Sequence, residues 1–295
     1  MNMKYLDPKN DLTFKCVFGE HKHLCMSLIN SMLPLPKPIV SLEYQTGELI
    51  AELPEVLRHS VVDVRCTDSD GRQFLVEIQL FFSEMFRRRL LINATEASVR
   101  QYKKTEEFKL PQPVYVLNFV NEVFILSKVM KNEYYHYYKI VNIKDTEKQI
   151  KGLEFLFVEL PKFKPQGRAE KKLHELWLRF LTEINESTKD VPEELIKNEL
   201  TREAVGYLEC AAYTIEQLDV YYQRKIEAMT ERGLISDALE KGRAIGLEKR
   251  EAERRSANRE ETVINCHKEG LSFDIISAVT SLPVEQIIEI LKRNV

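Results

Sequence analysis

A pair of β-rich segments around a short turn constrains this chain more than any other feature. Val61–Thr67 and Phe74–Phe81 are rich in β-branched and aromatic residues, and the Asp-Ser-Asp-Gly sequence at 68–71 is typical of a tight turn. If residues 69–71 form a three-residue loop, Gly71 takes the left-handed conformation that such hairpins need. We therefore expect an antiparallel hairpin in which Asp68 lies opposite Arg72.

The same register brings two acidic side chains face to face. Asp63 lies opposite Glu77, with Cβ atoms about 4.5–5.5 Å apart, and Gln79 shares the face of Glu77 because side chains alternate along a strand. Apolar neighbours lower the local dielectric and strengthen the repulsion between the carboxylates. A divalent cation relieves this repulsion, since Mg²⁺ binds through one or two carboxylates and keeps water and phosphate as other ligands. The pattern favours a metal site at Asp63 and Glu77, with Gln79 orienting the attacking water.

Two other interpretations of the hairpin stay open. Arg65 lies diagonal to Glu77 on the same face and would neutralise the acids as an ion pair. A two-residue turn at Ser69-Asp70 would shift the register and separate the acids. Either arrangement would leave the hairpin without a metal site.

The first 165 residues alternate between helical and strand-like patterns. We expect helices after the turn at residues 7–10 and over 84–108, and strands near 39–44, 61–67, 74–81, 114–120, 123–125, 134–141 and 153–160. This order predicts an α/β fold in which a central mixed sheet is flanked by helices.

After Pro165 the strand signals stop and charged helical periodicity takes over. The candidate helices are 168–187, 192–230 and 234–268, with a break near Gly233, and a helix–turn–helix outline follows at 270–295. The predicted divisions are thus 1–165, 166–269 and 270–295. The last helix is apolar and acidic, which suits docking to protein better than reading bases. We therefore expect a homo-oligomer formed through the C-terminal helices.

The charge pattern gives only local support for contact with nucleic acid. The net charge of the chain is −3, but residues 84–109 carry seven basic residues and four Glu. Arg87 and Arg88 follow the second hairpin strand and are candidate contacts for DNA phosphates, whereas the simpler interpretation is that they pair with Glu84 on an exposed helix.

Several other classes of protein are disfavoured. The five cysteines are scattered without a C-x-x-C pair, which indicates reduced thiols. No apolar run has the length of a signal peptide or a membrane span, so we expect a cytoplasmic protein without a membrane segment. With 10 glycines in the whole chain and no Walker or Gly-x-Ser-x-Gly sequence, phosphate-cradling loops and serine hydrolysis have no support.

The order of Asp63 and then Glu77-Ile78-Gln79 after a hairpin resembles the PD-(D/E)XK nuclease superfamily, in which Asp and Glu hold the metal and a Lys lies two positions after the Glu. The surrounding sequence is similar to one branch, the Rpn family of recombination-promoting nucleases, also described as transposases. The matching segments are Asp7-Pro8, Asn10-Asp11-Leu12-Thr13-Phe14-Lys15, Phe18-Gly19, Asp63-Val64-Arg65, Asp70-Gly71-Arg72, Val76–Gln79, Arg87, Arg88, Tyr102 and Val114–Phe119.

The resemblance implies a PD-(D/E)XK-like fold and Mg²⁺-dependent cleavage of DNA, with Mn²⁺ as a substitute ion and a role in recombination or mobile elements. It implies Asp63, Glu77 and the backbone carbonyl of Ile78 as metal ligands, and Asp11 as an additional acid. Gln79 stands where the Lys is usual. A neutral amide supplies hydrogen bonds but no positive charge to a developing phosphorane, so we expect a weak or conditional nuclease.

Two alternatives come from other functional classes. The first is a nuclease-fold protein without turnover that acts as a DNA- or protein-binding module. The second is a helical scaffold whose C-terminal segment is the working part. Truncation near residue 165 would separate the scaffold from a nuclease, because a nuclease domain would keep some cleavage.

Overall fold

The computed structural model describes residues 3–45, 63–103, 112–165 and 173–293. The chain forms two compact units, Met1–Ala228 (the first unit) and Met229–Val295 (the second unit). The predictions made above for residues 46–62, 104–111 and 166–172 fall outside the described residues. The three-part division at residues 165 and 269 stays a prediction.

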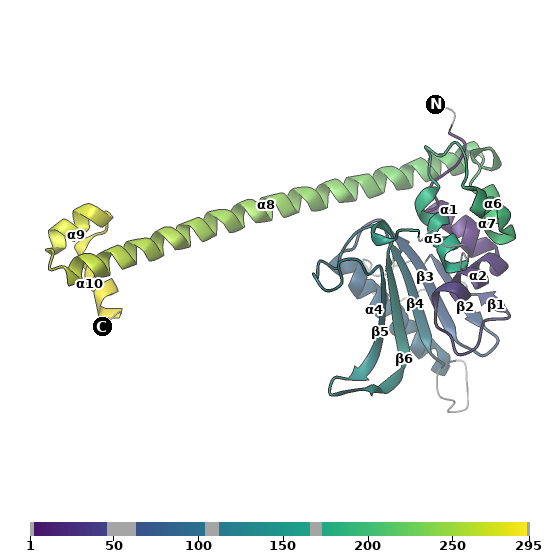
Figure 1. The fold of residues 1–295 in the computed structure, drawn as a ribbon, viewed down its shortest axis with the longest axis horizontal. Coiled ribbons are helices and arrows are strands. Elements are labelled where there is room, and N and C mark those ends of the chain that lie inside the picture. Colours follow the sequence, from purple (N-terminus) through teal and green to yellow (C-terminus); the bar gives the residue numbers. More distant parts are fainter. Residues whose placement is uncertain (1–2, 46–62, 104–111, 166–172, 294–295) are drawn as a thin grey trace. The chain divides into compact units, whose positions relative to one another are not determined.

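A six-stranded mixed sheet forms the centre of the first unit (Figure 1). Its strand order is β1-β2-β3-β4-β6-β5, with β4 parallel to both β3 and β6 and the other pairs antiparallel. The strands are β1 Leu42–Tyr44, β2 Val64–Asp68, β3 Gln73–Gln79, β4 Val114–Val120, β5 Tyr135–Asn142 and β6 Asp145–Glu159. The expected α/β fold is confirmed.

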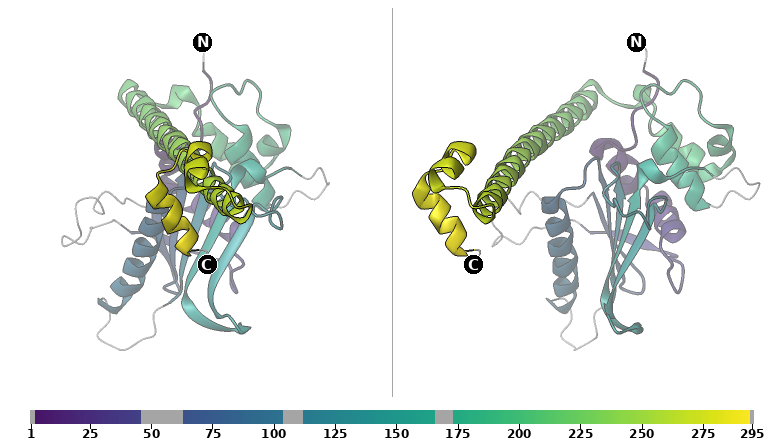
Figure 2. Two further views of the ribbon diagram at one scale, coloured as in Figure 1. Left: turned by 90° about the vertical axis from the view of Figure 1, so that its left-hand side faces the viewer. Right: turned by 60° about the vertical axis from the view of Figure 1, so that its left-hand side comes forward.

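Helices of the first unit cover both faces of this sheet, with α4 on one side and α1, α2, α5, α6 and α7 on the other (Figure 2). The helices are α1 Asp11–Phe14, η1 Lys15–Gly19, α2 Lys22–Met32, α4 Glu84–Lys103, η2 Leu160–Lys162, α5 Leu173–Glu183, α6 Glu193–Lys197, α7 Glu199–Gly206, η3 Cys210–Ala212, α8 Ile215–Lys268, α9 Phe273–Thr280 and α10 Val284–Arg293. None of the described helices combines the length and apolar character needed to cross a bilayer.

Two hydrophobic cores hold the layers together. The larger core joins Phe14, Phe18 and Trp177 to strand residues such as Val76 and Ile78. The smaller core, on the opposite face, joins α4 to side chains that include Leu75, Val116 and Phe157. Because both faces are covered, all seven residues of β4 are buried, as expected for a central parallel strand.

The β2–β3 hairpin has the register expected from the sequence. Val64 pairs with Val76 and Thr67 with Gln73, and Gly71 has a φ of +82°. The Nε atom of Arg72 lies 2.6 Å from Oδ2 of Asp68, which fixes the two ends of the loop. The alternative two-residue turn at Ser69-Asp70 is therefore wrong.

The expected strand at 123–125 is wrong for a reason that lies elsewhere in the chain. The N–H groups of Phe124 and Ile125 donate to Oε1 of Glu159 at 2.7 and 3.0 Å. A carboxylate thus satisfies the backbone groups that a neighbouring strand would otherwise pair, and the segment stays irregular.

Two predicted helix boundaries in the C-terminal half also need correction. Residues 192–230 do not form one helix, because Asn198 ends α6 and its side chain caps α7 by accepting from the N–H of Thr201 at 3.1 Å. Gly233 does not break a helix either, since α8 continues through it. A helical glycine costs only about 1 kcal/mol, which the surrounding helix formers outweigh.

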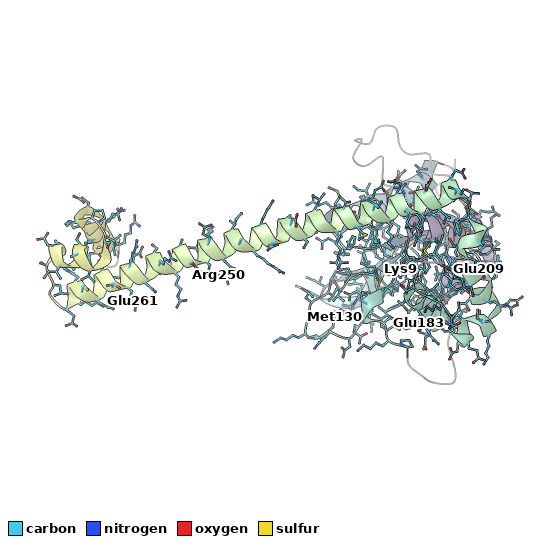
Figure 3. The ribbon with its side chains drawn as sticks, turned by 90° about the horizontal axis from the view of Figure 1, so that it is seen from above. Lys9, Met130, Glu183, Glu209, Arg250 and Glu261 are labelled. Atoms are coloured by element: carbon cyan, nitrogen blue, oxygen red, sulfur yellow. The ribbon has the colours of Figure 1, made fainter. Side chains whose placement is uncertain are left out.

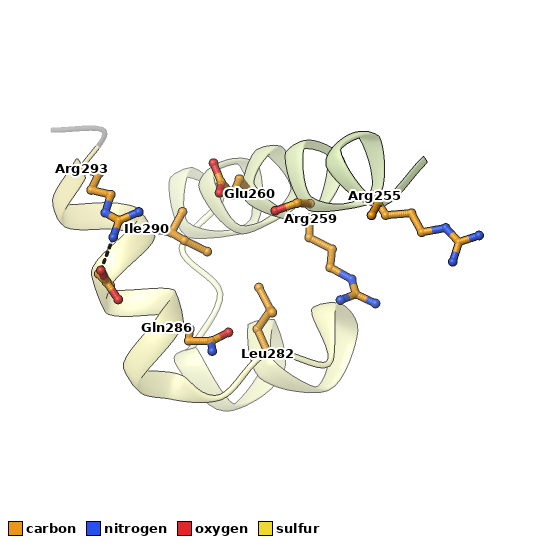
Figure 4. A pocket seen from close by; sticks show the side chains of 10 residues that line it. Arg255, Arg259, Glu260, Leu282, Gln286, Ile290 and Arg293 are labelled. Carbon is orange, nitrogen blue, oxygen red and sulfur yellow. Dashed lines mark hydrogen bonds and ion pairs between the residues drawn. The ribbon is translucent and has the colours of Figure 1, made fainter. Parts of the chain in front are cut away.

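The second unit is a small helical assembly with the helix–turn–helix outline expected from the sequence. The C-terminal part of α8 packs against α9 and α10 around Val263, Ile276 and Ile287. Residues 240–261 of α8 are exposed along their whole length, as the side chains around Arg250 illustrate (Figure 3). A groove of about 560 Å³ between α8 and α10 is lined by Arg255, Arg259 and other mostly polar residues (Figure 4).

Candidate active site

At the open end of the β2–β3 hairpin, an Asp side chain takes over a hydrogen bond that β2 would otherwise make. Strand β2 begins at Val64, so Asp63 lies just outside the ladder. Its Oδ2 atom accepts a hydrogen bond of 2.7 Å from the N–H of Ile78. In an antiparallel ladder this N–H would face the neighbouring strand. The carboxylate therefore occupies the position where β2 would have continued, and only 6% of the side chain is exposed.

The backbone of Ile78 also presents an oxygen toward this edge. The N–H and C=O of one strand residue point toward the same neighbouring strand. Because the N–H of Ile78 points to Asp63, its carbonyl is directed toward the same edge of β3. The side chain of Ile78 packs in the larger core, so only its backbone can serve as a ligand.

Glu77 lies on the α4 side of the sheet and is poorly satisfied. The residue is 4% exposed, and within the described chain the one hydrogen bond to its carboxylate comes from Asn93 of α4, at 3.5 Å. Burial raises the pKa of Glu77 to about 7, although Arg89 and Asn93 act to lower it. Gln79 is half-buried, ends β3 and shares the face of Glu77.

Asp63 is electrostatically linked to Glu77. Burial, a hydrogen bond with Asp11 and repulsion from Glu77 raise the pKa of Asp63 well above its usual range. The two acids thus interact at the hairpin end, where the register expected from the sequence puts them opposite each other.

Asp11 joins the site from the first turn of α1. Its side chain shares a hydrogen bond with Asp63. Burial opposes ionisation of Asp11, but the hydrogen bond from Asp63 and the charge of Lys15 lower its pKa overall. The structure therefore brings the additional acid suggested by the resemblance to the same place as Asp63, across about fifty residues of sequence.

Lys15 is a site residue that sequence reasoning did not single out. Its Nζ atom lies 2.7 Å from Oδ1 of Asp11 and 3.5 Å from Oδ1 of Asp63, and its charge also lowers the pKa of Glu77. The four-residue spacing between Asp11 and Lys15 predicts a pair on one helix face. No sequence pattern near Asp11 and Lys15 indicates that this pair contacts Asp63, which lies about fifty residues further along the chain.

Arg65 does not take the position that the ion-pair interpretation required. Arg65 and Glu77, both described, form no ion pair with each other. Burial lowers the pKa of Arg65, and its charge contributes less to the pKa of Glu77 than Arg89 does. The two acids are therefore not neutralised by a direct arginine contact.

The basic residues at the start of α4 fall into two groups. Arg87 and Arg88 are exposed, and each lies near Glu84, at 2.7 and 3.6 Å. Arg89 is half-buried, and its charge is the largest influence that lowers the pKa of Glu77. The charge of Arg89 thus acts on the acidic site, whereas Arg87 and Arg88 lie on the exposed surface of α4.

The donor set fits a hard divalent cation. Across the described ranges there is no group of three or more His, Cys, Asp or Glu side chains placed to hold a metal ion. Mg²⁺ needs only one or two carboxylates, because it keeps several water ligands. The buried carboxylate of Glu77 has a single long hydrogen bond within the described ranges, so its oxygens can serve as ligands, and the carbonyl of Ile78 adds a further oxygen.

Comparison with known proteins gives one match. A family model described as "PD-(D/E)XK nuclease family transposase" matches residues 8–238. No curated protein and no solved structure matches the chain.

Proposed function

Because the chain belongs to the PD-(D/E)XK nuclease family of transposases, we propose that it is a divalent-metal-dependent DNA endonuclease with Asp63 and Glu77 as its central acids. Membership of this family implies DNA as the substrate and a link to mobile elements. The proposal adds the reaction, hydrolysis of a phosphodiester bond, and the residues that catalyse it.

One observation carries this proposal more than the others. Two nearly buried carboxylates lie at the end of the β2–β3 hairpin. Burial raises the pKa of each, and repulsion from Glu77 raises the pKa of Asp63 further. Holding two acids together in this way costs folding free energy unless a cation is bound. A site that retains such a cost is a functional-site candidate.

Each residue has a distinct task in the proposed reaction. Asp63, Glu77 and the carbonyl of Ile78 would hold a Mg²⁺ ion, and the hydrogen bond from the N–H of Ile78 fixes the Asp63 carboxylate. A bound Mg²⁺ ion stabilises charge on a phosphoryl oxygen and lowers the pKa of a water. The amide of Gln79, one pleat beyond Glu77, orients the attacking water.

The DNA backbone approaches along α4 in this proposal. Arg87 and Arg88 are exposed and lie one helix turn from Glu84, at the start of the helix that follows the catalytic strand. Exposed guanidinium groups on this helix would position the phosphates without reading sequence.

The alternative is a nuclease-fold protein that binds DNA and cation without cleaving. The neutral amide of Gln79 favours this alternative, because the usual Lys of the motif would add positive charge. The two functions differ in turnover and not in binding, so one set of variants can separate them.

The test is cleavage of supercoiled plasmid with Mg²⁺ or Mn²⁺, together with Mn²⁺ binding followed by calorimetry. Asp63→Asn and Glu77→Gln should each lower the cleavage rate by at least about 100-fold and abolish Mn²⁺ binding. Glu43→Gln is the matched control, because Glu43 is an exposed acid of the same sheet, with its side chain 81% exposed. Cleavage that survives in Asp63→Asn would refute the site, and binding without cleavage by the wild type would establish the alternative.

A further inference from the structure

The site contains a lysine that the motif on β3 lacks. Lys15 approaches from the start of η1 and lies 2.7 Å from Asp11 and 3.5 Å from Asp63. No residue of β3 supplies a comparable charge, because the strand contains no Lys or Arg and Gln79, at the position of the usual Lys, is neutral. The cation thus reaches the carboxylates from a helix and not from the strand that holds Glu77.

The backbone around Lys15 is firmly anchored. Phe14 and Phe18, on either side of it, are fully buried in the larger core, and their rings lie 4.9 Å apart. The segment Lys15–Gly19 is a π-helical turn, a distortion that is frequent at functional sites. The Cα position of Lys15 is therefore fixed, while its side chain keeps 34% of its surface exposed.

The other cations near the acids are placed differently. The Nε atom of Arg224 lies 3.8 Å from Oδ2 of Asp11. Arg89 acts on Glu77 from the α4 side, with its guanidinium 5.9 Å from the ring of Phe86. Of the three, only Lys15 forms ion pairs with both Asp11 and Asp63 in the described structure.

We propose that Lys15 is a catalytic residue that supplies, from η1, the positive charge that Gln79 cannot supply from β3. This inference rests on the function proposed above. In the resting protein, the ammonium group pairs with Asp11 and Asp63. When these carboxylates face a bound cation and DNA, the ammonium contacts a non-bridging oxygen of the scissile phosphate and stabilises the charge that develops there.

The position of Lys15 predicts opposite effects on binding and on turnover. A lysine that only organised the acids would be needed for cation binding, so its removal would weaken binding. A lysine that acts on the substrate repels the cation in the resting state, so its removal leaves Mn²⁺ affinity unchanged or higher. Cleavage falls in both cases, and Mn²⁺ affinity therefore distinguishes the two roles.

The experiment compares Lys15→Met, Lys15→Arg and the control Lys22→Met. Lys22 lies on the neighbouring helix α2, and its Nζ atom pairs with the exposed Glu43 at 2.6 Å. Plasmid cleavage and Mn²⁺ calorimetry are measured for each variant, with circular dichroism to verify folding. We expect Lys15→Met to lose about 100-fold in cleavage rate with Mn²⁺ affinity at least as high as in the wild type. Lys15→Arg should retain most of the rate, and the control should match the wild type.

Gln79→Lys in the Lys15→Met background provides a second measurement. If the two positions supply the same charge, the double variant should regain at least about tenfold in rate over Lys15→Met. Wild-type cleavage in Lys15→Met, or a parallel loss of Mn²⁺ affinity, would overturn the role of Lys15 and leave the nuclease assignment intact. A wild type that neither binds Mn²⁺ nor cleaves DNA would overturn both.

Discussion

Two buried glutamates on the same sheet show how differently one fold treats the same side chain. Glu77 on β3 and Glu159 on β6 are separated by β4, and they are 4% and 0% exposed. Glu159 accepts from two backbone N–H groups and lies 2.7 Å from His136 Nε2 and 2.5 Å from Lys162 Nζ. Among the residues that the structure describes, Glu77 has one hydrogen bond, from Asn93 at 3.5 Å.

The pKa values of the two acids move in opposite directions as a result. Burial opposes ionisation of both. The contacts with Lys162, Ile125 and His136 outweigh burial and lower the pKa of Glu159, whereas burial dominates at Glu77. A buried carboxylate with a complete set of partners holds a fold together. A buried carboxylate that lacks such partners is a candidate binding site for a cation.

The largest effect is expected from neutralising Glu159. In Glu159→Gln, Lys162 loses its buried counter-charge, so the free energy of unfolding should fall by about 3–5 kcal/mol. Urea denaturation near neutral pH measures this loss. A change below about 1 kcal/mol would show that Glu159 is not a structural anchor, and the comparison would fail.

Glu77→Gln should change the free energy of unfolding in the opposite direction, so that the variant is more stable than the wild type. The folded-state pKa of about 7 exceeds the ordinary 4.5, so the stability contributed by the Glu77 proton is complete below about pH 4.5 and is lost as pH rises through about 7. Gln keeps the neutral form at every pH. The metal-free variant should therefore exceed the wild type by on the order of 3 kcal/mol at pH 8, with the difference disappearing near pH 4.5.

Urea denaturation of both proteins from pH 4.5 to 8 tests this expectation. Glu43→Gln serves as the control, because Glu43 is exposed and its substitution should leave the pH dependence unchanged. A wild type and Glu77→Gln with parallel pH profiles would mean that Glu77 ionises normally.

A divalent cation should remove the difference between the two glutamates. At 100 times its dissociation constant, Mn²⁺ stabilises the folded chain by about 2.7 kcal/mol, and the effect should grow as pH rises through 7 because the acids must be ionised. Differential scanning fluorimetry with and without EDTA detects the shift. The shift should be absent in Glu77→Gln and present in Glu43→Gln. An equal shift in all three proteins would place the bound ion elsewhere.

The smallest effect is expected at Arg89. Its charge lowers the pKa of Glu77 more than any other group, and a half-buried cation of this kind contributes about 1 kcal/mol or less. Arg89→Met should therefore raise the pH midpoint of Mn²⁺ binding by less than about one unit, as measured by calorimetry across pH. Arg88→Met, which removes an exposed arginine beside Glu84, should not move the midpoint.

The sequence predicted the hairpin at the site because its determinants are local. Turn residues 68–71 define the loop, strand alternation defines the faces, and together they predict the register of Val64 with Val76. The proximity of Asp63 to Glu77 follows from these short-range rules without knowledge of the rest of the fold.

The contacts that the sequence did not predict are long-range. Lys15 and Asp11 reach Asp63 only after α1 and η1 have packed on the sheet through Phe14 and Phe18. Glu159 satisfies the N–H groups of Phe124 and Ile125 from 35 and 34 residues away, and the β-branched and aromatic residues at 123–125 therefore gave a false strand prediction. Hydrophobic periodicity predicts a local helix or strand, but it does not show which distant side chain will take the hydrogen bonds that a neighbouring strand would make.

The three-residue loop at 69–71 also determines where the chain tolerates changes in length. One extra residue there would invert the facing of every side chain in β2 relative to β3 and would carry Asp63 away from the N–H of Ile78. The β5–β6 turn around Ile143, whose side chain is 91% exposed, has no such link to the acids. A peptide tag or fluorescent reporter is therefore better inserted at the β5–β6 turn than in the β2–β3 loop, which sets the register of the acids.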